Sequence, residues 1–335
     1  MDEVGHQAIG LDPLQHEAVA WVQRLISGQA TAADAGALKR WCAQSPAHAA
    51  AFAEASRVWS DIGPAGLDFC TSKAERVALL AQLRQRPAVG RRAVLGGGLA
   101  TAAVAAAYVL VDPPLGLWPS LTELNADYRT RTGEQRQITL ANHVLVQMNT
   151  QTSIAVQPPE GEVDRIELIA GEASFAMAPQ ARRPLVVLAA AGQTIGSGAR
   201  FDMRRLDGRT GPSVCVTCFD GTVRIKRNVD EVTLGPGQQV RYDASGLGRV
   251  GPVDPEIASA WQRGIVVFRS TPLAEVVEEI NRYRPGKIIL VNAELGRQPV
   301  NGRFRIDQMD AILTRLEQAF DAQIRTLPGG VVLLG

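Results

Sequence analysis

The spacing of apolar residues changes along the chain, and each change predicts a different kind of structure. Over residues 1–62 the spacing is helical, and the first predicted helix ends at Gly28. Thr31 is the expected N-cap of a second helix, with Asp34 at the acidic position of a capping box. A third helix is expected to start at Pro46, because proline fits the first helical turn. These signals predict a small all-α domain at the N-terminal end.

Beyond about residue 127 the spacing becomes a two-residue alternation, which is typical of strands. Gly, Asn and Asp interrupt the pattern repeatedly, so residues 112–255 are predicted to form a compact all-β domain, either a sandwich or a solenoid-like stack. Residues 256–335 then mix strand and helix patterns in two consecutive strand–helix–strand units. That order predicts an α+β domain of duplicated βαβ repeats at the C-terminal end.

One segment, residues 93–111, carries no charged side chain. Its length is close to the roughly 20 residues that a helix needs to cross the apolar part of a bilayer. Arg91 and Arg92 precede it, whereas residues 112–128 contain no Lys or Arg. By the positive-inside rule this asymmetry predicts a single transmembrane helix with its N-terminal side in the cytoplasm. Residues 63–92 would then form a juxtamembrane linker.

Three other interpretations of this segment stay open. Its alanines and glycines also suit a buried core helix. Residues 105–107 offer a cleavage site of the A-x-A type, but a secretory signal is expected much nearer the start of a chain. The pair Arg91 and Arg92 before an apolar run resembles a twin-arginine export signal, although Gly90 departs from the usual Ser or Thr.

The overall composition excludes several classes of function. The chain has 335 residues and a formal net charge of +1, with 46% hydrophobic and 21% charged residues. Direct nucleic-acid binding needs a concentrated basic face, which this balance gives no reason to expect. The four histidines lack metal-ligand spacing, and the chain has no recognisable catalytic or cofactor-binding motif. We therefore expect no enzyme activity, no metal site and no cofactor.

Two smaller features also have structural interpretations. Cys215 and Cys218 form a C-x-x-C motif, but residues three apart on a strand point to opposite faces, so we expect buried free thiols. If this stretch is instead a turn, the two thiols of an exported protein would be oxidised. The adjacent Glu278 and Glu279 are typical of a solvated helix face rather than of acid–base catalysis.

The first segment resembles the N-terminal domain of FecR-type anti-sigma regulators. The motifs A-x-x-W-x-x-R-L, S-G, L-x-x-W and S-P-x-H-A-x-A-F occur between residues 18 and 52 in the order found in that family. The resemblance implies that this domain binds an extracytoplasmic-function sigma factor in the cytoplasm, although its tryptophans also suit its own core. The candidate sigma-binding residues are Trp21, Arg24, Leu25, Leu38, Trp41, Phe52 and Trp59.

At three motifs, the β-patterned segment resembles the extracytoplasmic domain of the same family. They are T-x-x-G-E at residues 130–134, N-T-x-T at 149–152 and G-E-A-x-F at 171–175. His143 stands where the family commonly has Gly or Ser, so the turn at that position departs from the family pattern. The resemblance implies that this segment forms the sensing part of the protein.

Residues 256–335 resemble the short N-terminal domain that secretins and TonB-dependent transducers share, which also ends many FecR-type proteins. The resemblance implies a contact with the signalling domain of a TonB-dependent outer-membrane transducer in the periplasm. An exposed edge strand would accept such a partner by strand addition. The expected edge strand consists of Val331, Val332, Leu333 and Leu334.

These resemblances lead us to expect a single-pass inner-membrane anti-sigma regulator that relays a transducer's signal to the sigma factor, in iron or siderophore uptake. The signal would alter the span through cleavage by an intramembrane protease or through a change of pose. One alternative is a periplasmic structural component of a secretin-like assembly, which has no use for a sigma-binding domain. Another is an exported enzyme, for which a catalytic motif is missing.

Overall fold

The computed structural model describes residues 12–26, 30–65, 120–124, 126–140, 144–161, 163–178, 183–208, 211–326 and 331–335. The chain divides into two compact units, Met1–Ser120 and Leu121–Gly335. Most of the predicted linker, residues 63–92, lies outside the described residues, as does the whole predicted span, residues 93–111.

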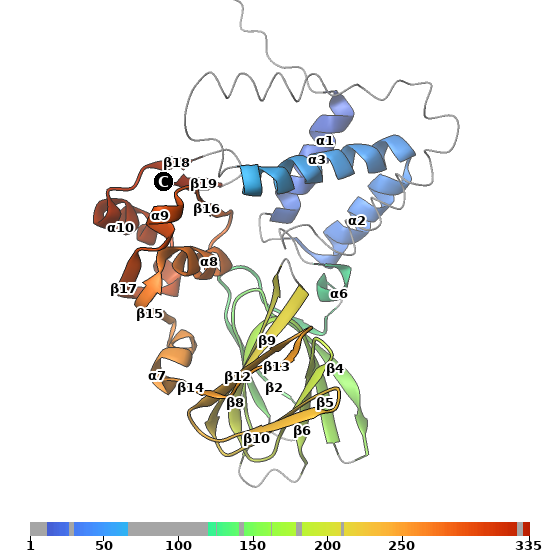
Figure 1. Ribbon diagram of the computed structural model, residues 1–335. Coiled ribbons are helices and arrows are strands. Elements are labelled where there is room, and N and C mark those ends of the chain that lie inside the picture. Colours follow the sequence, from blue (N-terminus) through green and yellow to red (C-terminus); the bar gives the residue numbers. More distant parts are fainter. Residues whose placement is uncertain are drawn as a thin grey trace, which may run out of the picture. The chain divides into compact units, whose positions relative to one another are not determined.

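Three helices form the described part of the first unit (Figure 1, blue). They are α1 (Pro13–Ile26), α2 (Ala32–Ala43) and α3 (Pro46–Ala65). The predicted capping box is confirmed, because the Asp34 amide donates to Thr31 Oγ1 at 3.3 Å and the Thr31 amide donates to Asp34 Oδ2 at 2.9 Å. Pro46 is the first residue of α3, as its position after Ser45 predicts.

The three helices enclose one apolar cluster. It draws side chains from each helix, which fixes how the helices pack, and each fully buried large side chain stabilises the unit by roughly 1.5–3 kcal/mol. The buried members are Ala18, Val22, Leu25, Ala30, Leu38, Trp41, Phe52 and Ala55.

The predicted inner-membrane location is contradicted. Among the helices of the described ranges, none is both long enough and apolar enough to cross a bilayer. Helix α3 has 20 residues, but polar residues such as His48 and Glu54 interrupt its sequence, so it is amphipathic rather than apolar throughout. The segment predicted to span, with Arg91 and Arg92 before it, is not among the described residues.

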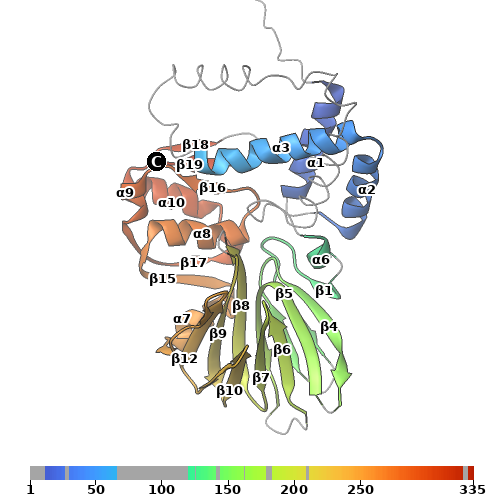
Figure 2. The same ribbon diagram turned by 45° about the vertical axis from the view of Figure 1, so that its right-hand side comes forward.

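The second unit begins with the short helix α6 (Leu121–Leu124) and consists mainly of strands (Figure 2). Within the described residues, fourteen strands join in one sheet. Their bounds are β1 (Tyr128–Arg129), β2 (Arg136–Thr139), β3 (Leu145–Met148), β4 (Ser153–Glu160), β5 (Val163–Ala176), β6 (Leu185–Ala189), β7 (Gly192–Gly196), β8 (Arg200–Gly208), β9 (Gly211–Asp220), β10 (Val223–Arg227), β11 (Asp230–Leu234), β12 (Gln238–Asp243), β13 (Gly246–Leu247) and β14 (Gly251–Pro252).

The long strand β5 organises this sheet. Its first half pairs with β4 and, in parallel, with β6, whereas its second half pairs with β3 and β8. The main path therefore runs β11-β10-β7-β6-β5-β8-β9-β12-β13. Tyr242 of β12 donates through Oη to the Ala189 carbonyl of β6 at 3.0 Å, so the two halves of the sheet face each other. A sandwich with one shared apolar core results, and the solenoid alternative is wrong.

The remaining residues form two small sheets around helices α8 and α10 (Figure 1, orange and red). Strands β15 and β17 form one sheet, and the other has the order β16-β19-β18. The elements are α7 (Pro255–Ala258), the 3₁₀ helix η4 (Ala260–Arg263), β15 (Ile265–Pro272), α8 (Leu273–Tyr283), β16 (Ile288–Leu290), α9 (Ala293–Gly296), β17 (Pro299–Arg305), the 3₁₀ helix η5 (Ile306–Gln308), α10 (Ala311–Phe320), β18 (Ile324–Thr326) and β19 (Val332–Leu334).

The predicted fold class is wrong. It required a transmembrane helix and a C-terminal α+β domain of βαβ repeats. The described structure instead has a small helical region followed by one large β-rich unit, Leu121–Gly335, which includes the C-terminal strands. Neither predicted repeat forms a sheet of its own. Strand β15 of the first repeat pairs with β17 of the second, and β16 of the first pairs with β19 of the second. Apolar spacing predicts the positions of elements but not their pairing partners.

Candidate functional site

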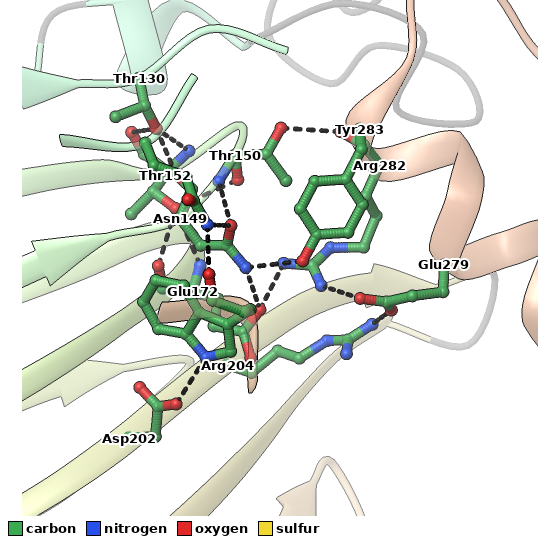
Figure 3. Close-up of polar contacts among 12 residues, drawn as sticks. Thr130, Asn149, Thr150, Thr152, Glu172, Asp202, Arg204, Glu279, Arg282 and Tyr283 are labelled. Atoms are coloured by element: carbon green, nitrogen blue, oxygen red, sulfur yellow. Dashed lines mark hydrogen bonds and ion pairs between the residues drawn. The ribbon is translucent and has the colours of Figure 1, made fainter. Parts of the chain in front are cut away.

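The three motifs at residues 130–134, 149–152 and 171–175 converge on one buried cluster (Figure 3). Thr130 Oγ1 donates to the Asn149 carbonyl at 2.5 Å and accepts from the Thr152 amide at 2.9 Å. Thr152 Oγ1 in turn donates to the Glu172 carbonyl at 2.9 Å and accepts from the Glu172 amide at 3.0 Å. These bonds fix the backbone on which the side chains of Asn149 and Glu172 stand.

Two motif glycines are required by the same packing. Gly171 has φ +86°, and a Cβ added to it would lie 2.5 Å from the Gln151 carbonyl oxygen and from Thr152 Cα. Gly133 has φ +76°, and its Cβ would lie 3.0 Å from the Tyr283 carbonyl oxygen. Both positions combine a left-handed backbone with a close approach of another segment, so only glycine fits without strain.

The strands carry polar side chains on the face that points away from the sandwich core. In β5, Ala173 and Phe175 belong to that core, so the alternating Glu172 and Ser174 point to the other face. Asp202 of β8 pairs with Ser174 and shares this face. The three polar side chains are nevertheless buried, because the C-terminal residues cover them.

Arg282, in the last turn of α8, lies at the centre of these contacts. Its Nη2 is 2.8 Å from Glu172 Oε2 and its Nη1 is 2.8 Å from Glu279 Oε1. Glu279 Oε2 also binds Arg204 Nη2 of β8 at 2.5 Å. The side chains of Arg282 and Glu172 are only 10% and 9% exposed, so these are desolvated ion pairs rather than surface contacts.

Two neutral groups complete the contact at the end of α8. Asn149 Nδ2 donates to Glu172 Oε2 and to Tyr283 Oη, both at 2.8 Å. Thr150 Oγ1 donates to the Arg282 carbonyl at 2.7 Å. The N-T-x-T motif therefore binds both the side chain and the backbone of the C-terminal helix.

A second contact lies at η4. The indole Nε1 of Trp261 donates to Asp202 Oδ2 at 2.9 Å, and Gln135 Nε2 donates to the Trp261 carbonyl at 2.8 Å. Gln262 Nε2 donates to Ser174 Oγ at 3.0 Å. We use the term polar interface for the side chains of both contacts. Its members are Gln135, Asn149, Thr150, Glu172, Ser174, Asp202, Arg204, Trp261, Gln262, Glu279, Arg282 and Tyr283.

The charged groups of the polar interface shift one another's pKa values. Burial opposes ionisation of Glu279, but Arg282 and Arg204 outweigh it and lower the pKa of the carboxyl to about 2. Burial raises the pKa of Asp202 well above its ordinary value, and the charge of Glu172 adds to the effect. Burial alone would lower the pKa of Arg282, but Glu279 and Glu172 raise it above its ordinary value. Asp202 therefore keeps its proton to a higher pH than Glu279 does.

This chemistry favours a holding role over a reactive one. Glu172 and Glu279 are each bound by an arginine, so neither is available to move a proton to or from a substrate. The polar interface joins residues of the sheet to residues of η4 and α8 far along the chain. It is best described as a contact that fixes the C-terminal helices and strands on the sheet.

Comparisons with known proteins place the sheet half of this contact in a known family. Residues 126–224 match the family model described as FecR protein. All three converging motifs lie inside that match. Residues 126–224 of this chain are a FecR domain. Residues 16–58, which include most of α1, α2 and most of α3, match a domain of unknown function named DUF4880.

Two crystal structures share the fold of part of this chain. They show a protein of Parabacteroides distasonis that is described provisionally as an anti-sigma factor, at 1.65 and 2.50 Å resolution. Each is 20% identical, with a TM-score of 0.53, and covers 62% of this chain and 97% or 96% of its own. No curated protein sequence matches the chain.

The FecR match contains only one side of the polar interface. Glu172, Asp202 and Arg204 lie inside residues 126–224, whereas Trp261 and Arg282 lie beyond them. In this chain, the matched domain therefore binds side chains that come from outside it.

Several predicted sigma-binding residues are core residues of the helical unit. Leu25, Leu38 and Phe52 are buried in its apolar cluster, where they have no free surface for a partner. Trp41 is also buried, and its Nε1 donates to Glu17 Oε2 at 2.7 Å. These four positions are explained by the packing of the unit itself.

Trp21 and Arg24 differ from them. Trp21 packs against the cluster but is only half-buried, and Arg24 is exposed and forms an ion pair with Asp34, Nη2 to Oδ2 3.3 Å. Both are on α1, one turn apart, so they share a face of that helix. The side chain of Trp59 is outside the described part of α3.

The prediction of an edge strand at residues 331–334 is wrong. Strand β19 pairs in parallel with β16 and antiparallel with β18, so it is the central strand of its sheet. Val332 and Leu334 are buried in the apolar core around α8 and α10. Their backbone groups face strands on both sides, which leaves no edge there for strand addition.

The two thiols of the C-x-x-C motif are free, as predicted. Both residues are on β9, with Cys218 buried in the sandwich core and Cys215 only partly exposed on the opposite face. Burial raises the pKa of both thiols, which makes them weak nucleophiles.

Sequence reasoning missed Asp202, Trp261, Arg282 and Tyr283, and misjudged Glu279. Glu278 is exposed, as the prediction of a solvated helix face requires, but Glu279 is bound by two arginines. The one available signal was the repeat of Val276, Val277 and Ile280, which places Glu279 beside the buried stripe of α8.

Proposed function

We propose that this chain is an anti-sigma regulator, in which the helical unit binds a sigma factor and the β-rich unit senses a second partner. The FecR match over residues 126–224 carries the proposal. It is supported by the shared fold of the Parabacteroides distasonis protein, which is described provisionally as an anti-sigma factor. The separation of the chain into a small helical unit and a large β-rich unit suits a protein with one partner for each.

We propose that the sigma factor binds to α1, at Trp21 and Arg24. Trp21 is half-buried and Arg24 is exposed, and tryptophan and arginine are among the residues most enriched at the hot spots of protein interfaces. We propose that the partner is an extracytoplasmic-function sigma factor. The packing of the three helices holds this face in place, and the residues that pack them together include Leu25, Leu38, Trp41 and Phe52.

The second partner is proposed to be the signalling domain of a TonB-dependent transducer, in iron or siderophore uptake. Since β19 is central, strand addition to its sheet would have to use β16 or β18, each of which has a strand on one side only in the described sheet. Co-purification of the full chain with a purified transducer signalling domain tests this contact, and no recovery would overturn it.

The sigma-factor proposal is tested by co-purification of the full chain with sigma factors expressed from the same genome. Wild type should recover one, whereas Trp21→Ala and Arg24→Glu should each lose at least about tenfold in affinity, as substitutions at binding hot spots do. Gln23→Ala, an exposed residue of the same helix, is the matched control and should bind as wild type. Recovery of no sigma factor with folded wild-type chain would overturn the proposal.

A further inference from the structure

The β-rich unit has two separate apolar cores. One core lies inside the sandwich and draws its side chains from the strands β2 to β12. The other lies between η4, α8, α10 and the two small sheets. In the part of the chain that the structure describes, no side chain belongs to both. The C-terminal region, residues 254–335, therefore does not depend on the sandwich for its own apolar core.

The chain crosses between the two cores at one point. The Val253 amide donates to the Gly237 carbonyl at 2.9 Å, which ties residue 253 to the sheet. The next residue, Asp254, caps α7 and pairs with Arg269 Nη1 at 2.8 Å, which ties it to the C-terminal region. Once the contacts with the sheet are broken, a change of backbone angles between these two residues is enough to move the whole region.

The contact between the two cores is polar at both of its ends. The α8 end has the pairs of Arg282 and Arg204 with the glutamates, and the η4 end has the bond from Trp261 to Asp202. Two buried atoms of this contact, Asp202 Oδ1 and Arg204 Nε, have no hydrogen-bond partner among the described residues. Burying charges and unsatisfied polar atoms costs free energy that undocking would return by hydrating them.

We propose that the C-terminal region docks reversibly on the sheet as one body, and that Arg282 is the positioning residue that keeps it docked. Opening breaks the polar interface and leaves both apolar cores intact. It also exposes Glu172, Asp202 and the indole N–H of Trp261 to water, while the rest of that ring stays in the C-terminal core. Any partner that binds only the undocked region shifts the equilibrium toward opening, in proportion to its preference for that state.

The indole N–H of Trp261 is the direct probe of undocking. It is buried against Asp202, so its hydrogen exchanges with solvent only when the region opens. Its resonance in the ¹⁵N spectrum of the full chain can be assigned with a Trp261→Phe variant. The backbone amides of Val276 and Ile280, in the middle of α8, report instead on unfolding of the C-terminal core.

In wild type, the free energy of Trp261 exchange should depend on urea less steeply than that of the two α8 amides. Undocking exposes only the surface of the polar interface, whereas unfolding exposes the C-terminal core as well, and the urea slope grows with the area exposed. Equal slopes and equal free energies would show that the region opens only by unfolding. That outcome would overturn the inference.

Arg282→Met should speed Trp261 exchange by roughly a hundredfold, because it leaves two buried glutamates without their shared cation. The two α8 amides should exchange as in wild type, and Arg282→Lys should restore part of the protection. Arg297→Met is the matched control, since Arg297 forms an exposed pair with Glu294 in the same region. Unchanged Trp261 exchange, or an equal rise at the α8 amides, would contradict reversible docking.

Discussion

Arg282 and Glu172 are 110 residues apart in the sequence and form a buried ion pair, Nη2 to Oε2 2.8 Å. Glu172 belongs to the G-E-A-x-F motif inside the FecR match, and Arg282 is beyond the end of that match. The pair therefore connects the family domain to the region that follows it. It gives the motif a physical role, which is to hold a cation from another part of the chain.

Glu279→Gln should destabilise the protein at neutral pH by about 2 kcal/mol or more, because it removes the charge that Arg282 and Arg204 share. The folded-state pKa of Glu279 is lowered from 4.5 to about 2, so its contribution is present above pH 4.5 and is lost as pH falls toward 2. Urea unfolding of both proteins over this pH range measures the difference.

Glu278→Gln is the control for that experiment. Glu278 is the exposed neighbour on the same helix, and its replacement should change the free energy of unfolding by less than about 0.5 kcal/mol. Equal effects of the two substitutions would mean that the ion pairs of Glu279 contribute nothing specific.

Asp202→Asn should stabilise the protein at neutral pH. The substitution keeps an acceptor for the Trp261 indole and removes a buried carboxyl whose pKa is raised well above 3.8. Wild type therefore loses stability as pH rises from about 4 toward that raised pKa, and the variant does not. The gain in unfolding free energy should consequently appear above pH 4 and grow with pH.

Urea midpoints of wild type and Asp202→Asn at a series of pH values check this expectation. Asp207→Asn, at an exposed position of the same strand, should leave the pH dependence as it is in wild type. A variant at position 202 that follows the wild-type pH dependence would show that the carboxyl of Asp202 is ionised without penalty.

Gly171→Ala should cost about 3 kcal/mol or more, because a Cβ there meets the backbone of residues 151 and 152 at 2.5 Å. Gly161→Ala is a matched control, since Gly161 also has positive φ, +63°, but open space around it, so it should cost only about 1 kcal/mol. Thermal unfolding distinguishes the two cases, and equal costs would assign the effect to backbone strain alone.

Much of the local structure could be predicted from the sequence. The capping box of Thr31 and Asp34 and the start of α3 at Pro46 depend on neighbouring residues, so short sequence patterns reveal them. The alternation of apolar residues in β5 and the glycines of the motifs were visible for the same reason. The predicted span rested on a similar local pattern, but among the described residues no helix is long and apolar enough to cross a bilayer.

The contacts of the polar interface could not be predicted in this way. Trp261 and Asp202 are 59 residues apart, and Asn149 and Tyr283 are 134 apart, so no local spacing relates them. Which of two adjacent glutamates is buried depends on the face of α8 that meets the sheet. Likewise, residues 331–334 were predicted to be an edge strand, whereas pairing with β16 and β18, far apart in the sequence, makes β19 central.

The most direct test of the account is a double-mutant cycle between Glu172 and Arg282 in the full chain. The singles Glu172→Gln and Arg282→Met and the double variant are compared through the opening free energy from Trp261 indole exchange. We expect a coupling energy of about 2 kcal/mol or more. The opening free energy of the double variant should then be only slightly lower than that of the more destabilised single variant. Losses that simply add would contradict the claim that this pair holds the C-terminal region on the sheet.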